Sequence, residues 1–213
     1  MAASQVRNFV NLRLLLTGVG GQGTLLASRL LGEAALAAGF SPLVSETHGM
    51  AQRGGIVIST VVLGDLQSPI ISPGEADILL GFEALEAFRA LSYCHSKSLA
   101  IVNTAAIIPY SVAIGKGVYP EITRLLSLMA DHVGAVCAFD AATLARQAGS
   151  PLAVNMVILG ALAATDYSPL SETEILAAIK AHTKAKFLEA NLTAFRLGAA
   201  AAREAGNWRR RSF

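Results

Sequence analysis

The sequence predicts an α/β fold, in which a mainly parallel sheet has helices on both faces and is followed by a helical C-terminal layer. Short, nearly continuous apolar runs alternate with helical patterns as far as about residue 148, as in parallel sheets that are buried on both faces. A glycine-rich turn at residues 18–23 joins the first apolar run to the first helical pattern. From residue 151 onward, only helical patterns follow.

The first half of the chain contains most of the expected sheet. Its strands are apolar or rich in β-branched residues, and we expect them at 12–17, 42–45, 56–63 and 77–82. Helical patterns follow the first and the last of these strands, at 24–38 and 83–90. Residues 46–55 are polar and contain glycines, which indicates a loop, and residues 69–72 are expected to pair back after a turn at 64–65.

The second half adds two strands and the C-terminal layer. The strands are expected at 99–103 and 135–139, and the segment 105–120 has no regular pattern. The helices have apolar residues at helical spacing, at 121–132, 141–147, 151–164, 172–181 and 184–202. Asp140 precedes one helix as a cap, and Ser171 and Glu174 have the spacing of a capping box.

Length and composition predict one domain with partners. Of the 213 residues, 53% are hydrophobic, and a domain of this size buries roughly 70% of the surface of its unfolded chain. We expect a single domain over residues 12–203, with loose termini at 1–11 and 204–213. Only 15% of the residues are charged, against about 25% in typical proteins, which indicates that another chain covers part of the surface. A second copy of this chain is one alternative for that partner. A net charge of +2 gives little reason to bind nucleic acid.

The cysteines and the apolar stretches indicate a cytoplasmic protein. Cys94 and Cys137 are too few and too far apart for a disulfide framework, a zinc site or an iron–sulfur cluster held by this chain alone. No apolar leader with a cleavage site is visible. The longest apolar stretch, 152–165, contains Asn155 and is too short to cross about 30 Å of hydrocarbon.

The turn at 18–23 has the sequence Gly-Val-Gly-Gly-Gln-Gly and makes the predicted fold Rossmann-like. Gly18, Gly20, Gly21 and Gly23 either allow a phosphate-bearing ligand to approach or simply make a tight strand-to-helix turn against a partner. Gln22 either donates to a ligand or caps a neighbouring loop. Both pairs of alternatives remain open at the level of sequence.

A second polar block at 48–55 is expected at the same edge of the sheet, where α/β proteins bind ligands. Arg53 is suited to a carboxylate or a phosphate, and Gln52 lies beside it. His48 is either a group that titrates near neutral pH or a hydrogen-bonding fixture. Together these side chains predict a surface that faces an active site or a partner subunit.

Glu46 keeps a dinucleotide site among the alternatives. It lies 23 positions after Gly23, near the end of the second expected strand, where such a site has an acidic residue for a ribose hydroxyl.

Asp77 and Glu83 flank a buried strand. Asp77 is expected to end a loop and Glu83 to start a helix, which argues against a paired acid and base. Asn155 is expected to anchor the loop next to it, with contact to the glycine turn as the other alternative.

Three blocks in series, at 18–23, 48–55 (His-Gly-Met-Ala-Gln-Arg-Gly-Gly) and 74–83 (Gly-Glu-Ala-Asp-Ile-Leu-Leu-Gly-Phe-Glu), resemble the gamma-type subunit of 2-oxoacid:ferredoxin oxidoreductases. The resemblance extends over roughly residues 12 to 200. Within the family, the small (beta) subunit of indolepyruvate oxidoreductase and the gamma subunits of pyruvate and 2-oxoglutarate oxidoreductases look most alike. The 2-oxoacids rank in that order for this chain.

The resemblance implies a division of labour between subunits. Partner subunits would hold thiamine diphosphate with Mg and the iron–sulfur clusters, a 2-oxoacid would be decarboxylated and usually passed to coenzyme A, and ferredoxin would accept the electrons. Here Gly64-Asp65-Leu66 is the nearest match to a thiamine motif, and it lacks the second glycine and the following Asn pair. We therefore expect no cofactor on this chain alone, no catalytic residue in it and no activity by itself.

Two other functions remain as alternatives. An independent NAD- or flavin-binding oxidoreductase would use the glycine turn together with Glu46. A non-catalytic scaffold would use the Rossmann-like shell for packing alone.

Overall fold

Six strands form one sheet in the computed structural model, which describes residues 11–48, 55–107 and 117–205. They stand in the order β2-β3-β1-β4-β5-β6. Their bounds are β1 Leu12–Val19, β2 Leu43–His48, β3 Ile56–Leu63, β4 Ala76–Gly81, β5 Cys94–Asn103 and β6 Ala135–Phe139.

The sheet is mainly parallel, as predicted, with one strand reversed. β1, β4, β5 and β6 pair in parallel, and their registers align Leu15 with Leu79 and Leu79 with Ala100. β3 runs antiparallel to both of its neighbours, β1 and β2, so that β2 has the direction of β1 but lies two strands away from it.

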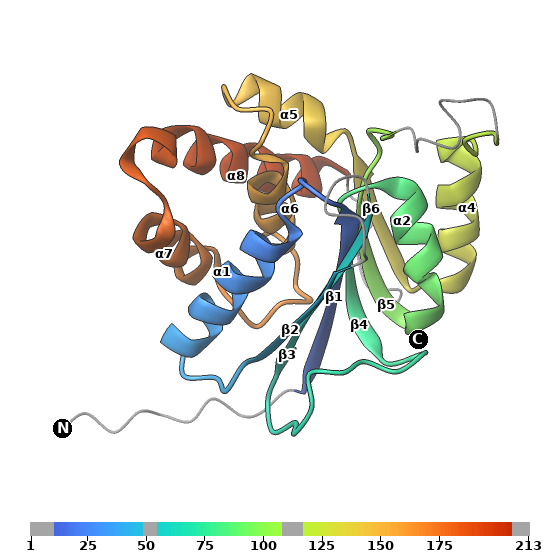
Figure 1. Ribbon diagram of the computed structural model, residues 1–213, viewed down its shortest axis with the longest axis horizontal. Helices are drawn as coiled ribbons and strands as arrows, with labels where there is room; N and C mark the ends of the chain where they lie inside the picture. The colour runs from blue at the N-terminus through green and yellow to red at the C-terminus, as the bar shows by residue number, and fades with distance from the viewer. Residues whose placement is uncertain (1–10, 49–54, 108–116, 206–213) are drawn as a thin grey trace.

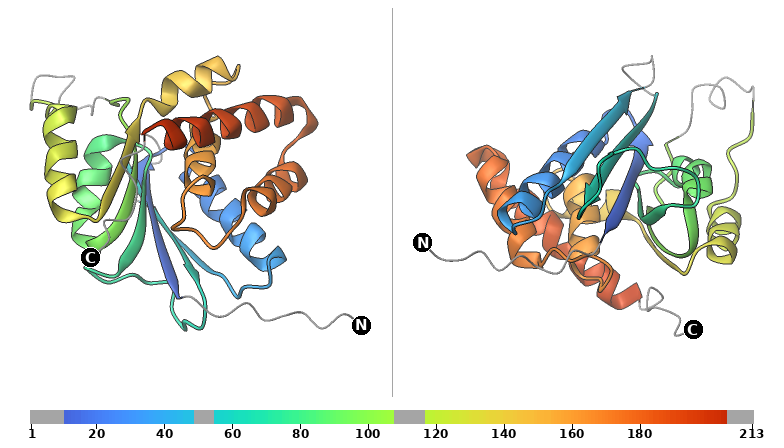
Figure 2. Two further views of the ribbon diagram at one scale, coloured as in Figure 1. Left: turned by 180° about the vertical axis from the view of Figure 1, so that it is seen from behind. Right: turned by 90° about the horizontal axis from the view of Figure 1, so that it is seen from below.

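Seven α-helices of the described residues lie on the two faces of the sheet. Their bounds are α1 Thr24–Ala37, α2 Ala84–Arg89, α4 Ile122–His132, α5 Ala141–Gln147, α6 Val154–Ala163, α7 Glu172–His182 and α8 Ala185–Ala205. A short 3-10 helix, η1, covers Ala90–Tyr93. Figure 1 and Figure 2 show α2 and α4 on one face, and α1 with α5, α6, α7 and α8 on the other. Within the described residues, no helix is both long and apolar enough to cross a membrane.

Alternation along the strands divides the core between these two layers. Leu14 and Leu16 of β1 belong to the larger apolar cluster, under α1, α6, α7 and α8, whereas Leu15 belongs to the smaller one, under α2 and α4. Successive side chains of a strand point to opposite faces. Each strand therefore contributes to both clusters, which explains why its sequence is almost continuously apolar.

The C-terminal layer is centred on a close contact between α6 and α8. α6 is buried over nearly its whole length. A Cβ atom added at Gly160 would lie 1.9 Å from the carbonyl oxygen of Phe195, and one added at Gly198 would lie 1.9 Å from that of Val157. Only glycine fits at these two positions, because the obstacle is the backbone of the facing helix.

Several predicted boundaries differ from those in the structure. β2 extends to His48, so Glu46 belongs to a strand and not to the loop predicted at 46–55. Residues 69–72 form no strand; the carbonyl oxygen of Pro69 only accepts a hydrogen bond from the hydroxyl of Thr60 (2.7 Å). Hydrogen bonding to a neighbouring strand extends β2 where polar composition indicated a loop.

The predicted helix starts are confirmed at two caps. The side chain of Asp140 accepts a hydrogen bond from the backbone of Thr143 (2.8 Å) at the start of α5. Ser171 and Glu174 form a reciprocal capping box at the start of α7. Such side-chain bonds satisfy amide groups that have no partner within the helix, which fixes where each helix begins.

Candidate functional site

The carboxyl ends of β1, β4 and β5 meet at one edge of the sheet (Figure 1). After β1 the chain passes into α1 on one face, and after β4 it passes into α2 on the opposite face. A divergence of this kind is where open α/β sheets bind ligands. The glycine turn and most of the predicted site residues lie at this edge, which we call the carboxyl edge.

Gln22 closes the space between the ends of β1 and β4. Its Oε1 accepts a hydrogen bond from the amide of Val19 (2.7 Å), and its Nε2 donates to the carbonyl oxygen of Phe82 (2.7 Å). A Cβ atom at Gly18 would lie 2.7 Å from that Oε1 and 2.8 Å from the Cβ of Phe82. Gly18 therefore makes room for the Gln22 bridge, which corresponds to the capping alternative for this side chain.

The next two glycines have different surroundings. The amide of Gly20 donates to the carbonyl oxygen of Gly55 (2.9 Å), which ties the turn to the start of β3. Gly21 is exposed, has a φ of 101°, and would have no atom within 4 Å of an added Cβ. A positive φ of this size favours glycine whatever the space around it.

Gly23 meets Asn155 from α6, and this is the alternative that the sequence interpretation ranked second. Gly23 has a φ of 80°, and a Cβ there would lie 2.6 Å from the Nδ2 of Asn155. The Nδ2 donates to the carbonyl oxygen of Gly23 (3.4 Å), and the Oδ1 accepts from the amide of Met156 (3.0 Å). Asn155 was expected to anchor the loop next to it. In the structure it instead contacts Gly23, a residue 132 positions away in the sequence.

Asn103, at the end of β5, completes the carboxyl edge and was missed by sequence reasoning. Its Nδ2 donates to the same Phe82 carbonyl oxygen that Gln22 contacts (3.0 Å). Its Oδ1 accepts from the amides of Ala105 (3.1 Å) and Ala141 (3.0 Å). A buried Asn directly after a β-strand run was the available signal, because a buried amide needs hydrogen-bond partners.

Glu46 does not lie where a dinucleotide site would need it. It is exposed on β2, and the register places it opposite Ser59, which in turn lies opposite Leu16 in the middle of β1. Two strand spacings, about 10 Å, separate it from β1. His48 lies nearer the glycine turn, since its partner Val57 pairs with Gly18. Gln52 and Arg53 lie outside the described residues, as does the side chain of His48.

Two buried carboxylates follow β4 on the face of α2. Glu83 caps α2 by accepting from the amide of Glu86 (3.0 Å), and it also accepts a hydrogen bond from the hydroxyl of Tyr119. The Oε1 of Glu86 pairs with Arg89 (2.6 Å), whereas its buried Oε2 has no hydrogen-bond partner among the residues that the structure describes. Burial raises the pKa of Glu86, and the neighbouring charge of Glu83 raises it further, against the opposing charge of Arg89.

The other acidic residue of this strand is at the far end of the sheet. Asp77 is the second residue of β4 and not the end of a loop, and it accepts from the amide of Arg13 (2.8 Å). Asp77 and Glu83 therefore cannot act as a pair.

The two cysteines are buried, and burial raises the pKa of Cys94 and of Cys137 to about 12. Among the described residues, no three His, Cys, Asp or Glu side chains are grouped as metal ligands.

An apolar pocket of about 310 Å³ adjoins the glycine turn. Leu26 of α1, Leu152 before α6 and Phe187 of α8 line it and are exposed to 40%, 77% and 47%. Polar side chains, among them His182 and Lys184, complete the lining. Asn155, which contacts Gly23, forms part of the same wall. Three large exposed apolar side chains around one hollow are typical of a surface that another molecule covers.

The geometry of the carboxyl edge supports the binding of another molecule more than it supports catalysis. Gln22, Asn103 and Asn155 are amides that do not titrate, and each is hydrogen-bonded to the backbone. Their hydrogen bonds connect the ends of β1, β4 and β5 with the starts of α1, α5 and α6. The result is a rigid edge with an apolar hollow beside it.

Comparison with known proteins places the whole sheet in one family. Residues 13–201 match the family described as pyruvate ferredoxin/flavodoxin oxidoreductase. The indolepyruvate oxidoreductase subunit IorB of Methanothermobacter thermautotrophicus is 39% identical over 195 residues, which cover 92% of this chain and 100% of the relative. The subunit of the same name from Thermococcus kodakarensis is 41% identical over 193 residues, which cover 90% of this chain and 96% of that one.

Solved structures share the fold at lower sequence identity. The gamma subunit of the keto/oxoacid ferredoxin oxidoreductase of Geobacter sulfurreducens has a TM-score of 0.67 at 23% identity and matches 91% of this chain and 99% of its own. The 2-oxoglutarate:ferredoxin oxidoreductase of Magnetococcus marinus, solved with 2-oxoglutarate, coenzyme A and succinyl-CoA, has a TM-score of 0.69 at 18% identity. It matches 91% of this chain but only 31% of its own, so the fold found here is one part of that longer polypeptide.

Proposed function

The chain belongs to the pyruvate ferredoxin/flavodoxin oxidoreductase family as a gamma-type subunit of a 2-oxoacid:ferredoxin oxidoreductase, and from this premise we propose that it is a non-catalytic, partner-facing subunit acting in the cytoplasm. In this proposal residues 12–203 form one domain. Its carboxyl edge, with Gly18, Gly20, Gly21, Gln22 and Gly23, faces the subunits that carry out the reaction. We propose that His48, at the end of β2, and Gln52 and Arg53, which lie outside the described residues, serve the same partners.

Indolepyruvate is the 2-oxoacid that we propose for the complex. The observation that supports it is the name shared by relatives of nearly equal length at 39% and 41% identity. Partner subunits would decarboxylate it on thiamine diphosphate with Mg, pass the product to coenzyme A and send electrons through iron–sulfur clusters to ferredoxin. The cofactor would supply the carbanion chemistry, and the subunits would position it.

The described residues do not fit those cofactors themselves. Iron–sulfur clusters need thiolates, but burial raises the pKa of both cysteines to about 12, and the two lie on different strands, β5 and β6. Glu46, which a dinucleotide site would have used, lies two strands away from the glycine turn. No step of the reaction is therefore assigned to this chain, and an independent NAD- or flavin-dependent activity is not supported.

The apolar pocket beside the glycine turn is the observation that carries the partner-facing role. Leu26, Leu152 and Phe187 leave an apolar hollow uncovered, directly beside a turn that Asn155 holds in place. Apolar side chains at the centre of an interface contribute most of its affinity. A partner that fills this hollow would be aligned by the rigid carboxyl edge.

Reconstitution tests the proposal. The purified chain alone should not reduce ferredoxin with indolepyruvate and coenzyme A, whereas mixing it with the thiamine- and cluster-bearing subunits should give turnover. Activity of the chain by itself would refute the non-catalytic role. Activity of the other subunits that is unchanged by leaving this chain out would refute its role as a necessary subunit.

A matched pair of substitutions locates the contact. Leu152→Asp replaces an exposed apolar side chain of the hollow with a charge that loses its hydration when a partner covers it, and should weaken assembly at least tenfold, or by about 1.4 kcal/mol. Ile70→Asp is the control, since Ile70 is equally exposed (74%) and lies in the β3–β4 connection. Size-exclusion chromatography of the mixed subunits measures assembly. Equal losses for the two variants would mean that the hollow is not the contact.

A further inference from the structure

One edge of the described sheet lacks the usual protection against pairing with another strand. Among the described strands, β6 pairs with β5 alone and ends the sheet. Its sequence, Ala-Val-Cys-Ala-Phe, contains none of the charged residues or prolines with which exposed edge strands are commonly protected. At the other edge, β2 presents the exposed carboxylate of Glu46. The edge at β6 is therefore suited to pairing with a further strand.

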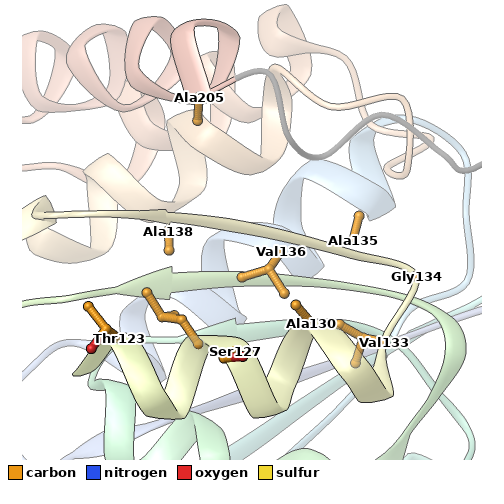
Figure 3. Close-up of a pocket in the computed structure, with 10 residues that line it drawn as sticks. Thr123, Ser127, Ala130, Val133, Gly134, Ala135, Val136, Ala138 and Ala205 are labelled. Carbon is orange, nitrogen blue, oxygen red and sulfur yellow. The ribbon is translucent and has the colours of Figure 1, made fainter. Parts of the chain in front are cut away.

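A groove of about 510 Å³ runs along β6, between α4 and the end of α8 (Figure 3). On the side of α4, its lining includes a row of small side chains about one turn apart, those of Thr123, Ser127 and Ala130. None of the described residues that line the groove is charged. Small side chains let two helices pack with their axes only about 8 Å apart. The row therefore leaves room for a second helix beside α4.

Two charged side chains of α4 flank this row of small residues. Arg124 lies three residues before Ser127 and Asp131 four residues after it, so both are neighbours of Ser127 on the helix surface. Both are exposed, and neither forms an ion pair within the part of the chain that the structure describes. A second α4 that runs antiparallel, with Ser127 opposite Ser127, brings each Arg124 next to the Asp131 of the other copy. This face of α4 is therefore complementary in charge to itself.

One two-fold axis can serve both α4 and β6. The two elements are joined by the short turn at 133–134 and run in opposite directions (Figure 3). Ser127 lies five residues before the end of α4, or about 7.5 Å from it. Cys137 lies two residues after the start of β6, or about 6.6 Å from it. An axis that is perpendicular to the sheet and passes beside Cys137 therefore also passes at the level of Ser127.

We propose that two copies of this chain associate through this edge, with β6 antiparallel to the β6 of the second copy and α4 packed antiparallel against its α4. The two sheets then form one continuous sheet. Such an isologous contact, in which the same surface of both copies meets across a two-fold axis, is the commonest kind in oligomers of identical chains.

This contact goes beyond the proposed function, because it leaves the apolar hollow beside the glycine turn uncovered. Phe187 lines that hollow near the start of α8, and Ala205 lines the groove at the end of α8. The two residues are about 27 Å apart along the helix. One chain can therefore contact a second copy and the other subunits at the same time.

Charge reversal on α4 tests the pairing. Arg124→Asp and Asp131→Arg each place like charges opposite one another at two points of the dimer. Each should raise the dissociation constant about tenfold, measured by analytical ultracentrifugation of the chain alone. Mixing the two variants should restore association and give dimers with one copy of each, because every acidic side chain at these positions of one variant then faces a basic side chain of the other.

The control is Lys180→Asp, the same kind of charge reversal at an exposed position of α7. It should leave the dissociation constant unchanged. Because Arg124 and Asp131 are also exposed, all three variants should fold as the unmodified chain does. Equal effects of the three substitutions, or no preference of the two α4 variants for each other, would overturn the proposed pairing.

Hydrogen exchange of the unmodified chain locates the contact without a substitution. Amide exchange in 135–139 should be slower in the dimer than in the diluted monomer, and exchange in 43–48, at the other edge of the sheet, should be the same in both. The proposal fails if the chain stays monomeric at every concentration. It also fails if 135–139 becomes protected only when the partner subunits are added, because a strand of a partner would then cover this edge.

Discussion

Two pairs of glycines in this chain leave room for different groups. Gly18 and Gly23, at the carboxyl edge, leave room for the polar ends of Gln22 and Asn155. Gly160 and Gly198, between α6 and α8, leave room for backbone carbonyl groups of the facing helix. At the carboxyl edge a Cβ atom would meet the amide groups of Gln22 and Asn155 and, at Gly18, also the Cβ of Phe82, whereas in the helical layer it would meet backbone carbonyl groups.

The surroundings of these glycines distinguish two regions: the carboxyl edge, which we propose to contact a partner, and the buried helical layer, which stabilises the fold. The carboxyl edge is assembled by single hydrogen bonds from amide side chains, next to an exposed apolar hollow. The α6–α8 contact is assembled by close packing around fully buried residues such as Val157 and Phe195. Substitutions at the edge should therefore change partner binding more than folding, and substitutions between the helices should do the reverse.

The largest expected effect is on the stability of the helical layer. Gly160→Ala should lower the free energy of unfolding by about 3 kcal/mol or more, because the added Cβ forces two helices apart in a packed core. Gly32→Ala in α1 is the matched control, since the nearest atom to its Cβ is a side-chain methyl of the exposed Val44, at 3.0 Å. Urea denaturation measures both. A similar loss in the two variants would contradict the distinction between backbone and side-chain obstacles.

A smaller effect is expected at Gly23. Gly23→Ala forces a side chain into the left-handed region, at about 1–2 kcal/mol, and displaces the amide of Asn155. The variant should still fold, but assembly with the partner subunits should fall more than unfolding stability does. Parallel urea denaturation and size-exclusion chromatography compare the two losses. Intact assembly with a large stability loss would place Gly23 with the structural pair.

Gly18 and Gln22 should act as one unit. Gly18→Ala removes the room for the Gln22 bridge, and Gln22→Ala removes the bridge itself, each at about 1–2 kcal/mol because the Val19 amide loses its partner. In a double-mutant cycle the second substitution should cost clearly less than the first. Strict additivity of the unfolding free energies would show that Gly18 serves another purpose, such as the contact with Phe82.

The smallest expected effect is the pH dependence that arises from Glu86. Because the pKa of Glu86 is raised in the folded state, the folded chain holds its proton more tightly than the unfolded chain does. Its contribution to stability is therefore present at low pH and is lost as the pH rises through 4.5 to the folded pKa. Glu86→Gln should gain stability relative to the unmodified chain over that rise. A constant difference between the two chains across the rise would be inconsistent with this assignment.

The sequence predicted the fold well, because it depends on patterns within single elements. Apolar runs such as β4 and the capping box of Ser171 carry their signal within a few residues. The reversed strand β3 and the position of β2 at the edge depend on pairing, which no local pattern reveals. That is why the sequence keeps Glu46 among the candidate ribose ligands, although β3 separates it from β1.

The site was predicted only in part, for the same physical reason. The glycine turn could be identified from its strand-to-helix context. The roles of its partners could not, because Asn155 contacts Gly23 across 132 positions of sequence, and Asn103 contacts the Phe82 carbonyl oxygen, which Gln22 also contacts, across 21. The burial of Glu86 Oε2, for which the described part of the chain offers no hydrogen-bond partner, is likewise visible only in the folded arrangement.

Hydrogen exchange of this chain, alone and in the reconstituted complex, tests the partner-facing role of the carboxyl edge most directly. Assembly should slow amide exchange in residues 18–26 and around Leu152 and Phe187, and leave exchange at the buried contact between α6 and α8, around Gly160 and Gly198, unchanged. If assembly instead protects other surfaces and leaves residues 18–26 exchanging as in the free chain, the carboxyl edge is not where this subunit meets its partners.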